Sequence, residues 1–245
     1  MAALDLTKIL FLDIETVPQT AEISALTPEL SHLWEDKFNL IQKRMPEKYN
    51  NETTAAEAYA NSAGIYAEFG KIVCISVGFI YFRGNQPCFR AKSFAGHDEK
   101  LLLEEFAEFL VKFCSTKEHT ICGHNIKEFD IPYICRRMLI HGVVLPALLQ
   151  ISGKKPWEIN FIDTLELWKF GDYKNYTSLK LLTAVFGIPT PKDDIDGSQV
   201  AQVYYQENDV QRIATYCQKD VLATAQVYLR MQGQQTILSE NIAFI

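Results

Sequence analysis

We predict that this chain folds as an α/β sandwich, in which helices cover a mixed five-stranded sheet. The order of the segments is the first reason: three strand-like runs, a helix, a strand, a helix and a fifth strand precede a group of helices. Size is the second, because 245 residues, 48% of them hydrophobic, suffice for one large core. We expect a single domain over residues 1–245, with a helical insertion at 17–68.

The first three strands are expected at the start of the chain and in a hairpin. Residues 8–14 form an apolar, strand-like run. Residues 71–82 and 86–95 form two more, separated by a short polar segment around Arg83, Gly84 and Asn85. Two such runs joined by a glycine-containing turn are typical of a β-hairpin.

Helices and strands then alternate along the rest of the chain. Residues 98–114 form an amphipathic helix whose first turn is acidic, which favours its dipole. Further strands are expected at 119–126 and 159–167, and further helices at 130–142, 177–186, 199–207 and 209–231.

Two carboxylates close the first strand. Asp13 and Glu15 are two residues apart, and side chains in a strand repeat every two residues, so both leave the same face. Taken alone, this pattern is more often a solvated strand end than a site.

Three further residues come from later segments. Asp130 opens the helix at 130–142, just after an apolar strand. Tyr216 and Asp220 are four residues apart on the last long helix, and therefore lie one above the other on one helix face. Each motif also has a purely structural alternative. The segment around Asp130 could be a capped helix start with a buried Phe129, and Tyr216 and Asp220 could be an exposed pair on a helix.

The joint occurrence of these three motifs favours a functional site over separate structural roles. Each motif lies where an element begins or ends, so four carboxylates and one tyrosine are available from three separate segments. Carboxylate oxygens are the hard ligands that Mg²⁺ and Mn²⁺ prefer. The set suits two divalent ions, about 3.5–4 Å apart, that act on a phosphodiester.

The three segments FLDIET, GHNIKEFD and YCQKD resemble the Exo I, Exo II and Exo III motifs of the DEDD 3′–5′ exonucleases. The tyrosine four residues before the last aspartate is the DEDDy form. The DEDDh form is excluded, because position 215 is Thr and the last histidine is His141. From about residue 8 to about residue 230, the chain is similar to a stand-alone exonuclease family resembling the exonuclease domain of family-B DNA polymerases.

This resemblance implies a ribonuclease H-like fold, with the first three strands antiparallel and the fourth and fifth parallel to the first. It also implies roles for the five residues. Asp13 would bridge both metal ions, and Glu15 and Asp220 would complete the ion on the nucleophile side. Asp130 would hold the leaving-group ion, and Tyr216 would orient the attacking water.

Four weaker candidates for substrate contact are Thr16, Asn125, Phe129 and Lys192. Asn125 matches the Exo II asparagine, although a strand-end amide that satisfies backbone groups is an equal alternative. Phe129 fits the core better than a stacking platform. Asp163 resembles a fifth ligand, but we interpret it as a strand-end residue that binds local backbone.

Charge and composition limit the classes of protein to which this chain can belong. The net charge of −6 argues against tight binding along a duplex, but not against an enzyme that holds a few nucleotides at a strand end. The chain has no run of about 20 apolar residues and no signal-peptide pattern, so we expect a cytoplasmic protein without membrane contact. Six cysteines without a CxxC pair indicate reduced, buried thiols, with neither disulfides nor a zinc site.

The sequence thus predicts a 3′–5′ exonuclease that uses two Mg²⁺ or Mn²⁺ ions on single-stranded 3′ ends, preferably of DNA, and releases nucleoside 5′-monophosphates. A polymerase or repair partner would act in trans, since no polymerase segment follows. One alternative is an exonuclease of RNA or short oligoribonucleotides, because 2′-OH discrimination depends on the shape of the pocket. The other is a non-catalytic nucleic-acid-binding subunit.

Overall fold

The computed structural model describes residues 5–114, 116–172, 174, 176–189 and 195–245. These residues form a six-stranded sheet in the order β5-β4-β1-β2-β3-β6. The strands are β1 (Ile9–Pro18), β2 (Gly70–Arg83), β3 (Gln86–Ala95), β4 (Thr120–Gly123), β5 (Ile162–Asp163) and β6 (Ile242–Phe244). β1, β2 and β3 pair antiparallel, while β4 is parallel to β1 and β5 is parallel to β4. The predicted fold class and strand directions are confirmed.

The sheet has one strand more than predicted. β6 pairs in parallel with β3 through Ile242, Ala243 and Phe244. The C-terminal tail therefore docks on the body of the protein. A three-residue strand is too short to show a side-chain period in the sequence.

The prediction of a strand over 159–167 is wrong for most of that range. β5 contains only Ile162 and Asp163, and Thr164–Lys169 is helix α5. The Asp163 side chain accepts hydrogen bonds from the backbone N–H groups of Leu165 (2.9 Å) and Glu166 (3.4 Å). This helix cap ends the strand early, because it satisfies the first amides of a helix.

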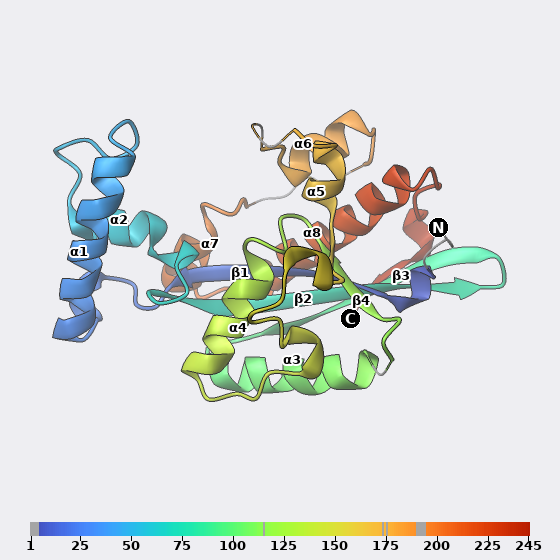
Figure 1. Cartoon of the computed structure of the whole chain (residues 1–245), viewed down its shortest axis with the longest axis horizontal. Helices are drawn as coiled ribbons and strands as arrows, with labels where there is room; N and C mark the ends of the chain where they lie inside the picture. The colour runs from blue at the N-terminus through green and yellow to red at the C-terminus, as the bar shows by residue number, and fades with distance from the viewer. Residues whose placement is uncertain (1–4, 115, 173, 175, 190–194) are drawn as a thin grey trace.

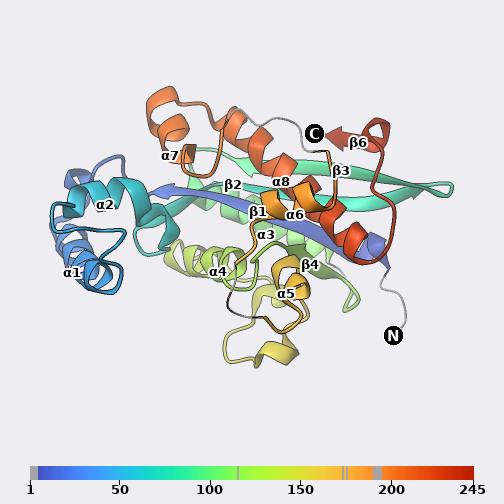
Figure 2. The same ribbon diagram turned by 90° about the horizontal axis from the view of Figure 1, so that it is seen from above.

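Helices cover both faces of the sheet (Figure 1). α3 (Glu99–Phe113) and α4 (Asp130–Ile140) pack on one face, where they share a core with Leu10, Leu12 and Ile14 of β1. α8 (Val210–Met231) runs across the strands on the other face, as the second view shows (Figure 2). α6 (Leu179–Val185), α7 (Val200–Gln202) and a π-helical turn (Val203–Glu207) lie in the segment that leads to α8.

Residues 17–68 carry two helices at the end of the molecule where β1 finishes (Figure 1). These are α1 (Pro28–Arg44) and α2 (Ala55–Ser62). They have a small core of their own around the buried Trp34, whose ring lies 5.4 Å from that of Tyr59 and 5.2 Å from that of Phe69. Short 3₁₀ turns along the chain are Leu6–Lys8, Ile23–Ala25, Ala63–Ile65, Ala147–Leu149, Pro156–Glu158 and Ser239–Asn241.

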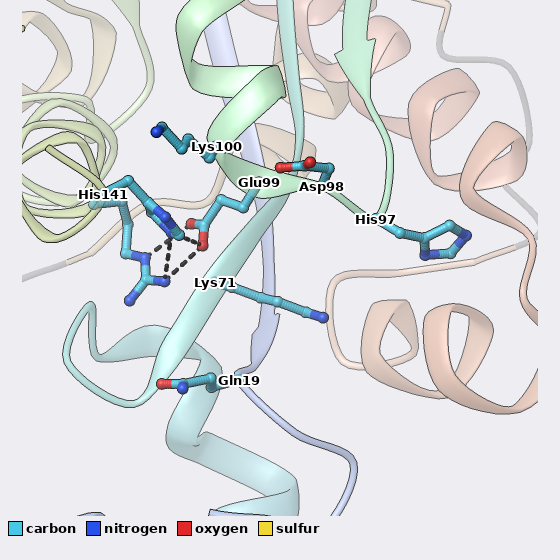
Figure 3. A pocket seen from close by; sticks show the side chains of 8 residues that line it. Gln19, Lys71, His97, Asp98, Glu99, Lys100 and His141 are labelled. Atoms are coloured by element: carbon cyan, nitrogen blue, oxygen red, sulfur yellow. Dashed lines mark hydrogen bonds and ion pairs between the residues drawn. The ribbon is translucent and has the colours of Figure 1, made fainter. Parts of the chain in front are cut away.

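Arg137 of α4 lies in a buried ion pair with Glu99 of α3. Its Nε and Nη2 donate to Glu99 at 2.8 and 2.6 Å, and both side chains are 5% exposed. Glu99 also accepts from the backbone N–H of Ile72 (2.7 Å), and His141 lies 2.8 Å from it (Figure 3). The network ties the start of α3 to the end of α4 and the start of β2.

Substituting Arg137 by Met should lower the free energy of unfolding by about 3–5 kcal/mol, because it leaves the buried Glu99 charge without a partner. Urea unfolding measures this. The neighbouring Arg136 is exposed, and Arg136→Met should change the same quantity by less than about 0.5 kcal/mol. Equal losses in the two variants would contradict the assigned role of the ion pair.

Candidate active site

β1 directs two carboxylates toward α8. Asp13 pairs with Ser76 and Glu15 with Cys74 of β2, so both side chains lie on the α8 face of the sheet. Directly after Glu15 the register shifts, because Thr16 pairs with Ile72 and leaves Val73 as an extra residue. A bulge of this kind increases local twist and re-aims side chains, and bulges are frequent beside active sites.

The turn after β4 places Asp130 against β1. Asn125 has a φ of 63°, and its carbonyl accepts from the N–H groups of Glu128 and Phe129. A Cβ at Gly123 would lie 2.6 Å from Ile126, so only glycine permits this tight turn. Asp130 then opens α4, as predicted, and its Oδ1 accepts from the backbone N–H of Ile14 (3.2 Å).

α8 provides the third part of the site. Its first turn is capped by Asp209, whose carboxylate accepts from the N–H of Arg212 (3.0 Å). Tyr216 and Asp220 follow on this helix, and a hydrogen bond joins the two side chains. The charge of Asp220 also raises the pKa of both Asp13 and Glu15. Asp220 of α8 therefore lies close to the two carboxylates of β1, in one site.

Burial and mutual repulsion dominate the electrostatics. Burial, followed by the charges of Asp130, Glu15 and Asp220, holds the pKa of Asp13 well above its usual range. Burial, followed by neighbouring charges of which Asp220 is the largest, does the same for Glu15. Burial raises the pKa of Asp130 to about 7, although its backbone hydrogen bonds act in the opposite direction. Within the described part of the chain, no Lys or Arg forms an ion pair with these three carboxylates.

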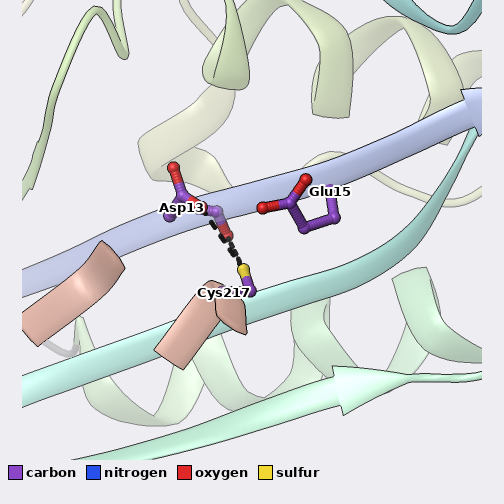
Figure 4. Close-up of side chains that lie close together, drawn as sticks. All are labelled: Asp13, Glu15 and Cys217. Carbon is purple, nitrogen blue, oxygen red and sulfur yellow. Dashed lines mark hydrogen bonds between the residues drawn. The ribbon is translucent and has the colours of Figure 1, made fainter. Parts of the chain in front are cut away.

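The donor atoms fit a divalent cation. One ligand atom each from Asp13, Glu15 and Cys217 lies within 4.8 Å of the other two (Figure 4). Carboxylate oxygens crowded without a cationic side chain are a donor set that suits Mg²⁺ or Mn²⁺. Cys217, which directly follows Tyr216 in YCQKD, was missed from the sequence because thiols are not expected beside hard ions; only its place in α8 reveals it.

The weaker sequence candidates divide into different environments. The Thr16 side chain forms a hydrogen bond with Tyr133, and Phe129 packs against the same ring at 5.5 Å. The Asn125 backbone N–H donates to Asp163 (3.0 Å), while its side-chain amide bonds to no described residue. Asp163 binds local backbone, as interpreted from the sequence. Lys192 lies outside the described residues.

Tyr176 is a residue near the site that the sequence did not indicate. Its side chain is exposed, and the charges of Asp130, Asp163 and Asp13 add to burial in raising its pKa. Its ring lies 6.3 Å from the ring of His124 in a T-shaped arrangement. His124 is fixed at both ring nitrogens, by the Thr164 hydroxyl and the Thr177 carbonyl, each at 2.9 Å.

Without metal, the protein should lose stability as the pH rises from 5.5 to 8. The folded state keeps protons on Asp13, Glu15 and Asp130 that the unfolded chain has already released, so the free energy of unfolding falls with pH in this interval. Melting temperatures measured in EDTA check this prediction.

Asp13→Asn should melt above the wild type in EDTA at pH 8, by about 2–4 °C for each kcal/mol of repulsion relieved. The exposed Glu47→Gln serves as the control and should not change the melting temperature. A destabilised Asp13→Asn protein with an intact fold at low pH would contradict the repulsion.

The comparisons with known proteins concern the fold and the family of this chain. The computed structure resembles a family B DNA polymerase from the hyperthermophilic archaeon Pyrobaculum calidifontis, with a TM-score of 0.53 and 14% sequence identity. The likeness covers 91% of this chain and 24% of the polymerase chain, and at this identity it shows a shared, ribonuclease H-like fold. No curated protein matches the chain. None of the described helices is long and apolar enough to cross a membrane.

A family match covers residues 65–243, which include Asp130, Tyr216 and Asp220. Asp13 and Glu15 precede the matched residues, but β1 brings them to the same place in the fold. The family is described as a predicted 3′–5′ exonuclease related to the exonuclease domain of PolB. The chain belongs to this family of predicted 3′–5′ exonucleases.

Proposed function

We propose that this protein is a divalent-metal-dependent 3′–5′ exonuclease that hydrolyses single-stranded DNA ends to nucleoside 5′-monophosphates. The observation that carries the proposal is the meeting of Asp13, Glu15, Asp130 and Asp220 from three elements, without an ion pair from Lys or Arg to the first three in the described part of the chain. Repulsion of this kind persists in native proteins chiefly where function requires it.

The carboxylates would hold two divalent ions, which supply charge neutralisation and an activated water when bound. Asp13, at the centre of the set, is repelled by all three other carboxylates and is therefore placed to be shared between two ions. Asp220 is the charge that acts most strongly on Glu15, which favours a joint role of these two carboxylates at one ion. Asp130, anchored to the Ile14 N–H, would serve the second ion.

Tyr216 would orient the attacking water. Burial, together with the charges of Asp220, Glu15 and Asp13, keeps the pKa of Tyr216 far above its usual value. The hydroxyl therefore stays protonated throughout the working pH range, and it acts as a hydrogen-bonding group rather than as a base. Its hydrogen bond to Asp220 fixes the direction in which it points.

Groups beside the carboxylates would receive the terminal nucleotide. The Asn125 amide bonds to no described residue, so it is available for a sugar or base. The Tyr176 ring would stack on a base, because it is exposed, lies near the carboxylates and is buttressed by His124. Thr16 would contribute through its backbone, since its side chain is hydrogen-bonded to Tyr133.

The two alternatives make different demands on the same site. An RNA exonuclease would use the identical carboxylates and would differ in how the rim accommodates a 2′-OH. A non-catalytic subunit would need neither the crowded carboxylates nor the Tyr216–Asp220 hydrogen bond. The retained repulsion around Asp13 speaks against this second alternative.

Purified protein with Mg²⁺ or Mn²⁺ should shorten labelled single-stranded DNA stepwise from the 3′ end, and EDTA should stop the reaction. Product ladders from DNA and RNA strands of the same sequence measure both direction and preference. A blocked 3′ end should prevent digestion, whereas a blocked 5′ end should not. A folded protein that degrades neither polymer would contradict the proposed function.

Asp13→Ala should lower the rate by about 10³-fold or more, because the loss of an ion removes several kcal/mol of transition-state stabilisation. Tyr216→Phe should lower kcat by about 10²-fold and leave Mn²⁺ affinity unchanged. Tyr228→Phe, on the same helix and packed against Phe11, is the matched control. Equal loss of Mn²⁺ binding in the Asp13 and Tyr216 variants would show that the roles are not divided in this way.

Tyr176→Ala should raise KM for single strands by about tenfold, since a base–aromatic stack is worth about 1–3 kcal/mol. Tyr176→Phe retains the ring and should keep KM near the wild-type value. Steady-state kinetics on one oligonucleotide separates KM from kcat. A fall in kcat alone would place Tyr176 in the reaction rather than in binding.

A further inference from the structure

Cys217 is the one sulfur atom in the donor group at the site. Its Sγ lies 3.4 Å from Oδ2 of Asp13, to which the thiol donates, and its side chain is fully buried. No two cysteines have the spacing of zinc ligands in the sequence, so a zinc site was not expected. The fold replaces that spacing, since it brings one cysteine of α8 beside two carboxylates of β1 (Figure 4).

Glu15 independently indicates that a ligand belongs there. The residue is 8% exposed and its carboxylate keeps only slight contact with solvent, yet it accepts no hydrogen bond and forms no ion pair within the described part of the chain. Figure 4 shows its carboxylate directed toward Asp13 and Cys217. A buried carboxylate without a partner is costly, and a bound cation would remove that cost.

The separations suit a small tetrahedral ion. Zn²⁺ binds sulfur at about 2.3 Å and carboxylate oxygen at about 2.0–2.2 Å, so its sulfur and oxygen ligands lie about 3.6 Å apart. The Cys217–Asp13 separation of 3.4 Å is close to this value. Three protein donors would leave a fourth position open to solvent, as in many zinc sites.

We propose that Asp13, Glu15 and Cys217 form a binding site for a thiophilic divalent ion of the Zn²⁺ class. Hard ions such as Mg²⁺ avoid sulfur, whereas Zn²⁺, Co²⁺ and Cd²⁺ accept it, and Zn²⁺ binds most donor sets more tightly than Mn²⁺. A thiophilic ion at this site occupies the two β1 carboxylates that the proposed exonuclease needs. It therefore inhibits the enzyme, a consequence that rests on the proposed function.

Titration of the metal-free protein with Cd²⁺ or Co²⁺ tests the site without any activity measurement. A thiolate ligand produces a charge-transfer band in the near ultraviolet, and the wild type should develop this band with one equivalent of metal. Cys217→Ser should lose the band. Cys88→Ser removes a buried thiol on β3, away from the donor group, and is the control that should keep the band. Cys74→Ser removes the thiol that is hydrogen-bonded to Cys217; because Cys74 lies outside the donor group, this variant should also keep the band.

Circular dichroism establishes that each variant is folded, and Glu15→Gln provides a second variant should Cys217→Ser not fold. Glu15→Gln should weaken Cd²⁺ binding by at least about tenfold, which is the lower end of the loss seen even for outer contacts of a metal site. A wild type without the band, or a band that persists in Cys217→Ser, would overturn the proposal, as would loss of the band in Cys74→Ser alone.

Zinc inhibition links the site to the reaction. The Zn²⁺ concentration that halves Mg²⁺-supported hydrolysis should rise by about tenfold or more in Cys217→Ser. A wild type that binds Cd²⁺ through sulfur but degrades no nucleic acid would reject only the proposed function. A wild type that degrades DNA but shows no sulfur–metal band would reject only the thiophilic site.

Discussion

The repulsion among the crowded carboxylates, of which Glu15 and Asp130 are buried, is the constraint on which the site depends. Asp13 lies against three other acidic side chains, and burial further penalises its charge. In many proteins a Lys or Arg would compensate such a group, but no described basic side chain forms an ion pair with Asp13, Glu15 or Asp130. The folded chain thus carries a cost that bound cations relieve, which makes metal binding and stability parts of one equilibrium.

The rest of the fold holds these charges in place. The hydrogen bond from Ile14 to Asp130 fixes the start of α4, and the buried Arg137–Glu99 pair fixes its other end. The two contacts act on opposite ends of one helix, so α4 cannot move Asp130 away from β1. The bulge after Glu15 marks the point where β1 ceases to serve the site and continues toward residues 17–68.

Much of this could be predicted from the sequence, because strand and helix periods fix which face a side chain occupies. Those periods predict the shared face of Asp13 and Glu15 and the pairing of Tyr216 with Asp220. These periods do not describe contacts between segments. Only the structure therefore reveals that Arg137 is buried, that Cys217 lies beside Asp13 and that Tyr176 lies near the carboxylates. The prediction of a strand at 159–167 was wrong for a local reason. The Asp163 side chain caps a helix there, and this cap determines the local structure more strongly than the apolar run does. The division of the chain into a core and an insertion at 17–68 stays a prediction.

The family match and the fold describe different parts of the same site. The matched residues 65–243 include Asp130, Tyr216 and Asp220, while β1 adds Asp13 and Glu15 from outside that range. The central claim is that these residues together form one metal centre. Anomalous diffraction from crystals grown with Mn²⁺ tests it most directly. We expect manganese peaks in contact with Asp13, Glu15 and the carboxylates of Asp130 or Asp220. Well-ordered crystals at saturating Mn²⁺ with no peak at this cluster would contradict it.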